Sequence, residues 1–172
     1  MRRLLLASAT LMSAAAAPIT ATCHCGAVLL RIASGAKPQA RSICHCPTCR
    51  SLSGAPFLAN LVFAAPVVEL LSSRGDDPPD LIETATSKHV TRKRCAECFS
   101  PVAASLGKKS VVVPFAMFER DALPAEWRSL QHHMYYDSRV IDVNDDLPKY
   151  KSHFGGELWV DEATADPGAG PE

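Results

Sequence analysis

The chain has 172 residues, of which 47% are hydrophobic and 21% are charged, and its formal net charge is zero. That length fits a single domain that buries a core of its own. The balanced charge, and the lack of a Lys/Arg stripe interleaved with aromatic residues, argue against a nucleic-acid-binding protein.

The first 17 residues differ in composition from the rest of the chain. Arg2 and Arg3 precede three leucines and a run rich in Ala and Ser, which is typical of a signal peptide and too short for a transmembrane helix. Three interpretations stay open for this leader: a signal peptide, an organelle transit peptide, or a start codon chosen too far upstream. Because a protein with many thiols suits a reducing compartment, we expect the cytoplasm, with an organelle or secretion as alternatives if the leader is a working targeting segment.

The body of the chain, residues 18–155, is predicted to be one domain built mostly of strands. Thirteen prolines and nine glycines are spread along the whole chain and divide it into segments that are too short for long helices. We expect a first strand within residues 26–33. Two more strands are expected within residues 57–71, with Pro66 between them.

The middle of the chain continues this pattern. Residues 72–80 have the composition of a loop. The Thr-rich residues 81–94 are expected to form one half-buried strand that leads to the last pair of cysteines. Residues 101–105 and 110–115 are predicted to form a hairpin that turns at Gly107.

The last third of the chain offers weaker signals. Residues 118–130 are expected to include one short helix with Trp127 on its buried side, and residues 140–143 a final short strand. Residues 156–172 are predicted to be a disordered acidic tail, because no large apolar side chain follows Val160 to offset the entropy of ordering it. The sum is a mostly β, single-domain protein with at most one or two short helices.

Seven cysteines fall into three clusters: Cys23-His24-Cys25, Cys44-His45-Cys46-Pro47-Thr48-Cys49 and Cys95-Ala96-Glu97-Cys98. Side chains at i and i+2 of an extended segment lie on one face roughly 6.6 Å apart, so two thiolates can converge on one zinc ion at about 2.3 Å. Two cysteines separated by two residues do the same around a turn. Disulfides would leave at least one of the seven thiols unpaired, which argues against a fully disulfide-bonded protein. The spacing of the cysteines favours zinc ligands over disulfides, and also over thiols that are only buried or reactive.

Seven ligands divide naturally into four and three, because structural zinc takes four protein ligands whereas catalytic zinc keeps one position open. The spacing alone leaves the division open. The pairs Cys46/Cys49 and Cys95/Cys98 are also compatible with a zinc ribbon. In that arrangement, Cys23, Cys25 and Cys44 would not be ligands of the ribbon zinc.

Three blocks of sequence carry a resemblance to a known family. They are Cys23-His24-Cys25-Gly26-Ala27-Val28, Cys44-His45-Cys46-Pro47-Thr48-Cys49-Arg50-Ser51-Leu52-Ser53-Gly54-Ala55-Pro56-Phe57 and Cys95-Ala96-Glu97-Cys98-Phe99-Ser100-Pro101. Together with residues 133–139 and 145–150, they resemble the glutathione-dependent formaldehyde-activating enzymes, whose domain is shared with centromere protein V. The resemblance spans about residues 19–151.

The resemblance implies a single-domain Mss4-like fold of antiparallel sheets with zinc-binding knuckles and two Zn²⁺ ions per chain. It further implies a carbon–sulfur lyase that adds glutathione, or another small thiol, to a small aldehyde such as formaldehyde. The ligands implied for the structural zinc are Cys23, Cys25, Cys95 and Cys98, and those implied for a second, catalytic zinc with an open position are Cys44, Cys46 and Cys49.

Other polar residues near these blocks are candidates for the thiol pocket. Arg50 follows Cys49 and is placed to meet a glutathione carboxylate. His133 is a candidate for lining the pocket or for shuttling a proton, although a hydrogen-bonded structural histidine is the simpler interpretation. His24 and His45 alternate with cysteines and are expected to point away from the metal.

The competing functional class is a non-enzymatic zinc module that binds a protein partner, since a fold does not fix a function. Neither class requires a nucleic acid or a membrane, and the sequence does not indicate an oligomeric state.

Two further expectations concern the last pair of cysteines. Arg92, Lys93 and Arg94 immediately precede Cys95, so they are placed to offset the net charge of minus two that four thiolates leave on Zn²⁺, unless they are simply solvated. The resembling family usually has glycine after the second cysteine of this pair, whereas this chain has Phe99. If that position requires a positive φ, the phenylalanine is strained.

Overall fold

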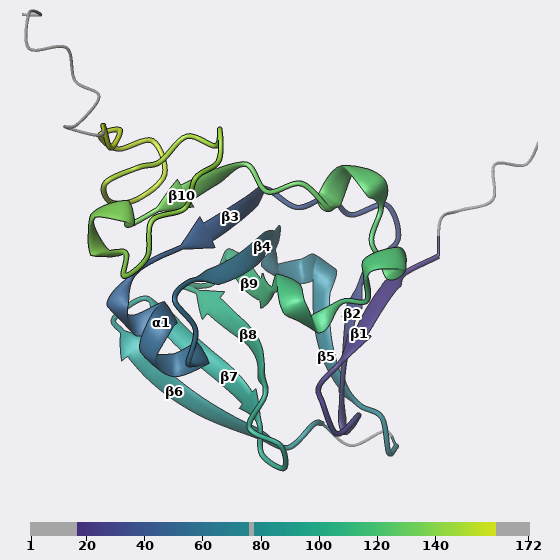
Figure 1. Ribbon diagram of the computed structural model, residues 1–172. Coiled ribbons are helices and arrows are strands. Elements are labelled where there is room, and N and C mark those ends of the chain that lie inside the picture. Colours follow the sequence, from purple (N-terminus) through teal and green to yellow (C-terminus); the bar gives the residue numbers. More distant parts are fainter. Residues whose placement is uncertain (1–16, 76–77, 161–172) are drawn as a thin grey trace, which may run out of the picture.

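The computed structural model describes residues 17–75 and 78–160, which form two β-sheets and one short α-helix (Figure 1). The smaller sheet has the order β1-β2-β5, with bounds Ile19–Thr22, Val28–Ile32 and Val68–Ser72. The larger sheet has the order β10-β3-β4-β9-β8-β7-β6. Its strands are, in chain order, β3 Ala40–Cys44, β4 Leu58–Ala64, β6 Leu81–Ser87, β7 Val90–Cys95, β8 Pro101–Leu106, β9 Ser110–Pro114 and β10 His132–Met134, and the helix α1 is Pro47–Ser53.

The prediction of a mostly β fold with few helices is confirmed. β2 lies within the first predicted strand, and the hairpin β8–β9 turns at Gly107, which has a φ of 57°. β4 and β5 are the two strands expected on either side of Pro66, and a 3₁₀ turn at Ala65–Val67 separates them. These two strands belong to different sheets, so the turn carries the chain from one sheet to the other.

The single strand predicted for residues 81–94 is wrong. The segment folds back on itself as the hairpin β6–β7, in which Ser87 pairs with Val90 across a two-residue turn. The backbone N–H of Gly107 donates to the carbonyl of His89 at 2.7 Å, which ties this turn to the neighbouring hairpin. No glycine, proline or asparagine marks the turn, and the Thr-rich sequence on both sides therefore reads as one continuous strand.

The strand predicted at residues 140–143 is also absent, and β10 forms earlier in the chain. Val140 and Ile141 are 58% and 46% exposed. β10 instead pairs with β3, and this pairing is parallel, whereas the other strand pairs of both sheets are antiparallel. The helix expected within residues 118–130 is a pair of 3₁₀ turns, although Trp127 is buried as predicted.

The ends of the chain were predicted to lie outside the domain. Residues 1–16 and 161–172 lie outside the described residues, and the predictions for the leader and for most of the tail fall there. Residues 156–160, which were assigned to the disordered tail, form backbone hydrogen bonds: Lys151 N–H donates to the carbonyl of Glu157, and Trp159 N–H to that of Lys149. Within the described ranges, no helix combines the length and the apolar character needed to cross a bilayer.

Alternation along the strands gives the larger sheet two different faces. Leu61 and Phe63 of β4 and Val113 of β9 are fully buried and pack with Leu30, Ile32 and Trp127 in the core between the sheets. Because neighbouring residues of a strand point to opposite faces, Asn60 and Val62 of β4 lie on the other face, where they line a cavity with Val112 of β9. The core thus supports a sheet whose opposite face is free to form a site.

Phe99 occupies the left-handed region, with a φ of 60°, so the strain expected from its sequence position is present. Replacing Phe99 by Gly is expected to raise the free energy of unfolding by about 1 kcal/mol, which corresponds to a melting temperature about 2–4 °C higher. Little packing is lost, because Phe99 is 60% exposed. Thermal unfolding would measure this. Phe99→Ala keeps the strained Cβ and is the control; a Gly variant no more stable than the Ala variant would refute the strain.

Candidate metal centres

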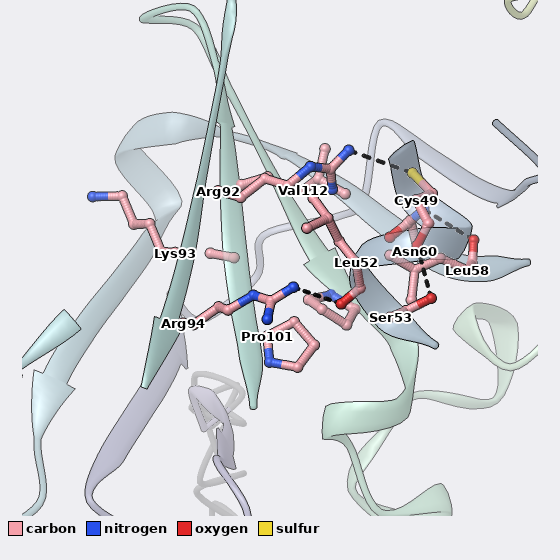
Figure 2. A pocket seen from close by; sticks show the side chains of 13 residues that line it. Cys49, Leu52, Ser53, Leu58, Asn60, Arg92, Lys93, Arg94, Pro101 and Val112 are labelled. Carbon is pink, nitrogen blue, oxygen red and sulfur yellow. Dashed lines mark hydrogen bonds between the residues drawn. The ribbon is translucent and has the colours of Figure 1, made fainter. Parts of the chain in front are cut away.

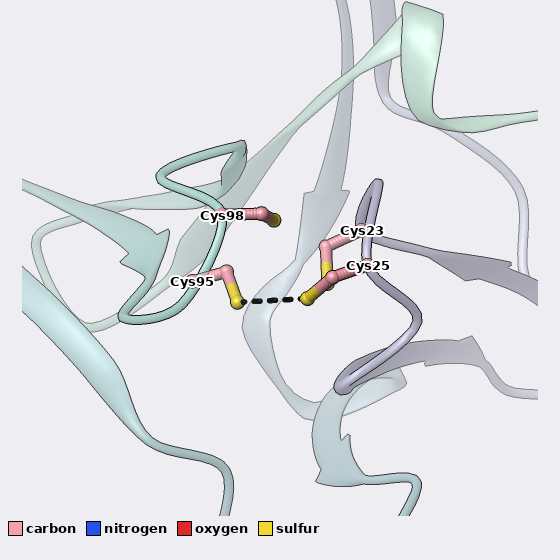
Figure 3. A group of neighbouring side chains, drawn as sticks. All are labelled: Cys23, Cys25, Cys95 and Cys98. Atoms are coloured by element: carbon pink, nitrogen blue, oxygen red, sulfur yellow. Dashed lines mark hydrogen bonds between the residues drawn. The ribbon is translucent and has the colours of Figure 1, made fainter.

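The first group of thiols joins the two sheets. Cys23 and Cys25 lie in the turn from β1 to β2, Cys95 ends β7, and Cys98 lies in the turn before β8. Figure 3 shows the four side chains converging from these two segments, and their sulfur atoms all lie within 4.8 Å of one another. The group is therefore a cross-link between the smaller and the larger sheet.

The distances in this group fit a metal and exclude a disulfide. Cys23 Sγ and Cys25 Sγ are 3.6 Å apart, and Cys25 Sγ and Cys95 Sγ are 3.7 Å apart. Four sulfurs placed tetrahedrally about 2.3 Å from one zinc ion would be about 3.8 Å from each other. A disulfide requires a distance of about 2.05 Å between its two sulfur atoms, and all seven cysteines are free thiols.

Backbone turns hold the four sulfurs in place. Gly26, with a φ of 79°, closes the first turn by donating its N–H to the carbonyl of Cys23. The N–H of Phe99 closes the second turn on the carbonyl of Cys95. Hydrogen bonding with Ser100 lowers the pKa of Cys98 to about 5, which favours the thiolate that a metal requires.

The bases before Cys95 do not serve this group, contrary to expectation. Lys93 Nζ donates to Glu83 at 2.6 Å, and Arg94 Nη2 donates to the carbonyl of Leu52 at 2.6 Å. Figure 2 shows Arg92 and Arg94 extending towards α1, whereas Lys93 points to the other side of β7. Alternation along the strand therefore sends Arg92 away from the four-cysteine group and towards the other thiols.

The second group of thiols is built on β3 and the start of α1. Cys44 ends β3, Cys46 is the N-cap of α1, and Cys49 lies in its first turn, with the N–H of Cys49 donating to Cys46 Sγ at 3.3 Å. Pro47 is the first helical residue, where its missing N–H costs nothing. The three sulfurs lie within 4.8 Å of one another. The structure thus groups the cysteines as four and three, and does not bring them together as a zinc ribbon.

The three thiols are too close to ionise independently. Hydrogen bonds from Cys44 and then Cys49 lower the pKa of Cys46 to about 2, whereas hydrogen bonds with Cys46 and Cys49, together with burial, raise the pKa of Cys44 far above its usual value. Without a cation, the group therefore concentrates its negative charge on one sulfur. A divalent metal ion would allow all three to be thiolates.

A cavity of about 410 Å³ adjoins these three thiols on the open face of the larger sheet, within the usual range of about 300–1,000 Å³ for small-molecule sites. Apolar side chains from β4, β8 and β9 form much of its wall. Tyr135 lies at its edge with a φ of 55°. The residues that line it are Ser42, Cys44, Cys46, Thr48, Cys49, Asn60, Val62, Thr86, Ser87, Val90, Arg92, Ala104, Leu106, Val112, Met134, Tyr135 and His153.

Arg92 is the cation next to the three thiols, which the sequence did not indicate. Its Nη2 donates to Cys49 Sγ at 3.5 Å (Figure 2), and its Nε donates to Thr86 Oγ1 at 3.3 Å. The signal that would have found it is the period of two in β7: Arg92 and Arg94 fall on one face and Lys93 on the other.

The two residues proposed for the thiol pocket, Arg50 and His133, do not line the cavity. Arg50 Nε donates to the carbonyl of His45 at 3.0 Å, so it braces the start of α1. His133 is fully buried, because β10 directs Met134 towards the cavity and His133 to the opposite face. Its role as a hydrogen-bonded structural histidine, the simpler interpretation, matches its contacts.

His133 links His45 to a carboxylate. His133 Nδ1 lies 2.9 Å from His45 Nε2, and His133 Nε2 lies 3.0 Å from Asp145 Oδ2. Burial opposes ionisation of Asp145, but hydrogen bonds from Lys149 and His133 outweigh it and lower the pKa of this carboxyl below its usual range. Burial lowers the pKa of His45 to about 4. The neutral His45 ring belongs to neither sulfur group and packs instead against His133 and Tyr136.

Comparison with known protein families assigns the chain to one of them. The family model described as "Glutathione-dependent formaldehyde-activating enzyme" matches residues 18–138. The chain belongs to this family. The matched region contains both groups of thiols and every strand of the two sheets.

Other comparisons add little to the family assignment. The crystal structure of a Rhodobacter sphaeroides protein, solved as a structural genomics target, is similar to the chain with a TM-score of 0.45 and 17% sequence identity. The similarity covers 64% of this chain and 96% of the Rhodobacter chain. No curated protein matches the sequence significantly.

Proposed function

We propose that the protein is a zinc-dependent carbon–sulfur lyase that adds glutathione, or a similar small thiol, to formaldehyde or another small aldehyde. The observation that carries the proposal is that an incomplete set of three thiols lies in the wall of a cavity of small-molecule size. Zinc at Cys44, Cys46 and Cys49 would keep a fourth position for substrate, whereas zinc at the four-cysteine group would be closed. The family to which the chain belongs supports the same reaction.

Zinc bound by three thiolates would supply a Lewis acid that keeps a substrate thiol deprotonated at its free position. The chain's own residues determine where the reaction takes place. Arg92 places positive charge beside Cys49, and Val62 and Val112 provide apolar surface that limits water in the cavity. In the forward direction, the substrate sulfur bonds to the aldehyde carbon, the carbonyl π pair moves onto oxygen, and that oxygen takes up a proton in place of the one the thiol released.

The cavity also favours an enzyme over a non-enzymatic interaction module. A module that binds a protein partner through its surface needs no small-molecule site beside its metal. In the proposed enzyme, the open position and the cavity are required together. Seven thiols, all of them free, would work best in a reducing compartment such as the cytoplasm.

The proposal can be tested by exchange NMR on the zinc-loaded protein. Glutathione and formaldehyde also combine without a catalyst, so catalysis appears as faster exchange between free formaldehyde and its glutathione adduct. The rate should rise in proportion to protein concentration and return to the buffer value after a chelator removes the metal. Exchange at the buffer rate with fully metal-loaded protein would contradict the proposal.

Arg92→Gln is expected to lower kcat/KM by about 10–100-fold, because a hydrogen bond from a charged group contributes about 1.5–3 kcal/mol. Zinc content should stay at the wild-type value, since all seven cysteines remain. Steady-state kinetics with a metal assay would measure both. Lys93→Gln is the matched control, because Lys93 lies on the other side of the same strand and pairs with Glu83. Equal activities of the two variants would exclude a role for Arg92.

A further inference from the structure

Ser42 and Asn60 form a pair of buried polar residues in the floor of the cavity. They face each other across the antiparallel strands β3 and β4, so their Cβ atoms are about 4.5–5.5 Å apart. Ser42 is 1% exposed and Asn60 is 4% exposed, and both line the cavity beside the three thiols. Neither residue was indicated by the sequence.

Both side chains carry a polar atom without a partner. Among the described residues, no group hydrogen-bonds to Ser42 Oγ or to Asn60 Oδ1. Buried polar atoms are nearly always satisfied, and an exception calls for an explanation such as a bound ligand or an ordered water molecule. Two such atoms in neighbouring positions of one cavity point to a site for a polar group.

The hydrogen-bonding roles of the two atoms can be assigned. Asn60 Nδ2 donates to the carbonyl of Leu58 at 3.0 Å, so the amide oxygen Oδ1 remains as the free acceptor of a residue that lines the cavity. The Ser42 hydroxyl both donates and accepts. The site therefore offers one donor and one acceptor side by side, which is what a hydroxyl group, or a carbonyl oxygen that becomes one, requires.

The position of the pair relates it to the thiols. Ser42 and Cys44 are two residues apart in β3, on the same face, and thus about 6.6 Å apart along the strand. Arg92, which also lines the cavity, is already bonded to Cys49 and Thr86. Val62, Ala104 and Val112 supply apolar wall nearby. A small molecule that reacts beside Cys44 would therefore find two buried polar atoms without a protein partner, at Ser42 and Asn60.

We propose that Ser42 and Asn60 bind the aldehyde oxygen of the substrate and the hydroxyl group that this oxygen becomes. Ser42 donates a hydrogen bond to the carbonyl oxygen of the aldehyde. As the carbon–sulfur bond forms, the carbonyl π pair moves onto that oxygen, which takes a proton from water while the thiol proton passes to water. The new hydroxyl group then donates to Asn60 Oδ1. This inference rests on the proposed function and assigns the aldehyde half of the same site.

A crystal structure of the zinc-loaded protein tests the site without any turnover. It should contain a water molecule hydrogen-bonded to both Ser42 Oγ and Asn60 Oδ1. Soaking with formamide should replace that water, with the formamide oxygen accepting from Ser42 and its N–H donating to Asn60. Absence of any ordered atom within hydrogen-bond distance of the pair, in both crystals, would overturn the proposal.

Kinetics of Ser42→Ala and Asn60→Leu test the role in the reaction. Each variant is expected to lower kcat/KM for the aldehyde by about 10–100-fold and to leave KM for the thiol within twofold of wild type. Ser110→Ala is the control: it removes a hydroxyl that bonds to Gln39 in the same sheet and does not line the cavity, so its kinetics should match wild type.

Thermal unfolding separates substrate binding from a structural role. Ser42→Ala removes a buried polar atom that has no protein partner among the described residues, so its melting temperature should equal or exceed that of wild type while its activity falls. A lower melting temperature together with lost zinc would mean that Ser42 is structural. Wild-type kinetics in Ser42→Ala would overturn the aldehyde subsite and leave the proposed lyase intact. If the wild-type protein shows no turnover, the proposed lyase activity is wrong. The crystal structures would then be the test of whether Ser42 and Asn60 bind a polar group.

Discussion

Cys95→Ser is expected to lower the melting temperature by about 10–20 °C and to remove one of two zinc ions per chain. The four sulfurs of this group come from both sheets, so one metal ion bound there would hold together segments 70 residues apart. Structural zinc contributes about 10–16 kcal/mol of binding free energy in small peptides. If about 5 kcal/mol of this binding free energy stabilises the fold, its loss corresponds to a decrease of about 10–20 °C in melting temperature for a domain of this size.

The measurement is thermal unfolding combined with metal analysis of the purified variant. Cys46→Ser is the matched control, because it also removes one metal ligand. It should melt within about 5 °C of wild type, since the second group connects only β3 to the helix that follows it. A Cys95→Ser protein that keeps two zinc ions and has the melting temperature of wild type would contradict the structural role of the four-cysteine group.

Cys46→Ser is expected to reduce turnover with glutathione and formaldehyde by at least about 1,000-fold, because the reaction is assigned to the metal that Cys46 helps to bind. The fold should survive for a specific reason. Cys46 is the N-cap of α1 and accepts the N–H of Cys49, and serine is among the best N-cap residues. The loss of activity would thus be separated from any loss of structure.

Exchange NMR measures the activity of this variant, and circular dichroism checks its fold. Ser51→Ala, which changes an exposed hydroxyl bonded to the carbonyl of Pro47 on the same helix, should retain wild-type activity. If Cys46→Ser catalysed the exchange as fast as wild type, the second group of thiols would not be the catalytic site.

Parts of the fold that depend on local pattern were predictable from the sequence. The hairpin β8–β9 has a glycine at its turn, and Pro66 divides β4 from β5 as expected. The hairpin β6–β7 was missed because its turn lacks the residues that usually mark one. β10 was missed because three residues become a strand only by pairing with β3, more than 80 residues earlier. Conversely, residues 140–143 have the composition of a strand but no strand beside them.

In the candidate site, the cysteine ligands were predictable from the sequence, whereas the other residues around the cavity were not. The spacing of the cysteines leaves their division open, and the family resemblance implies groups of four and three. The structure brings the same thiols together. Ser42 and Asn60 could not be inferred, because they meet the thiols only through strand register across the larger sheet. For Arg92 the period of two in β7 separates it from Lys93, but its contact with Cys49 depends on the same register. Arg50 and His133 were chosen for their closeness in sequence to motif residues, but local geometry directs both away from the cavity.

X-ray absorption at the zinc edge tests the central claim most directly, on a Cys95→Ser protein in which the second group of thiols alone retains metal. An open site should give three sulfur ligands at about 2.3 Å and one oxygen or nitrogen ligand at about 2.0–2.2 Å. Added glutathione should convert this to four sulfur ligands. A spectrum with a complete protein ligand set that does not change with glutathione would contradict the account, because no position would then be open to the substrate.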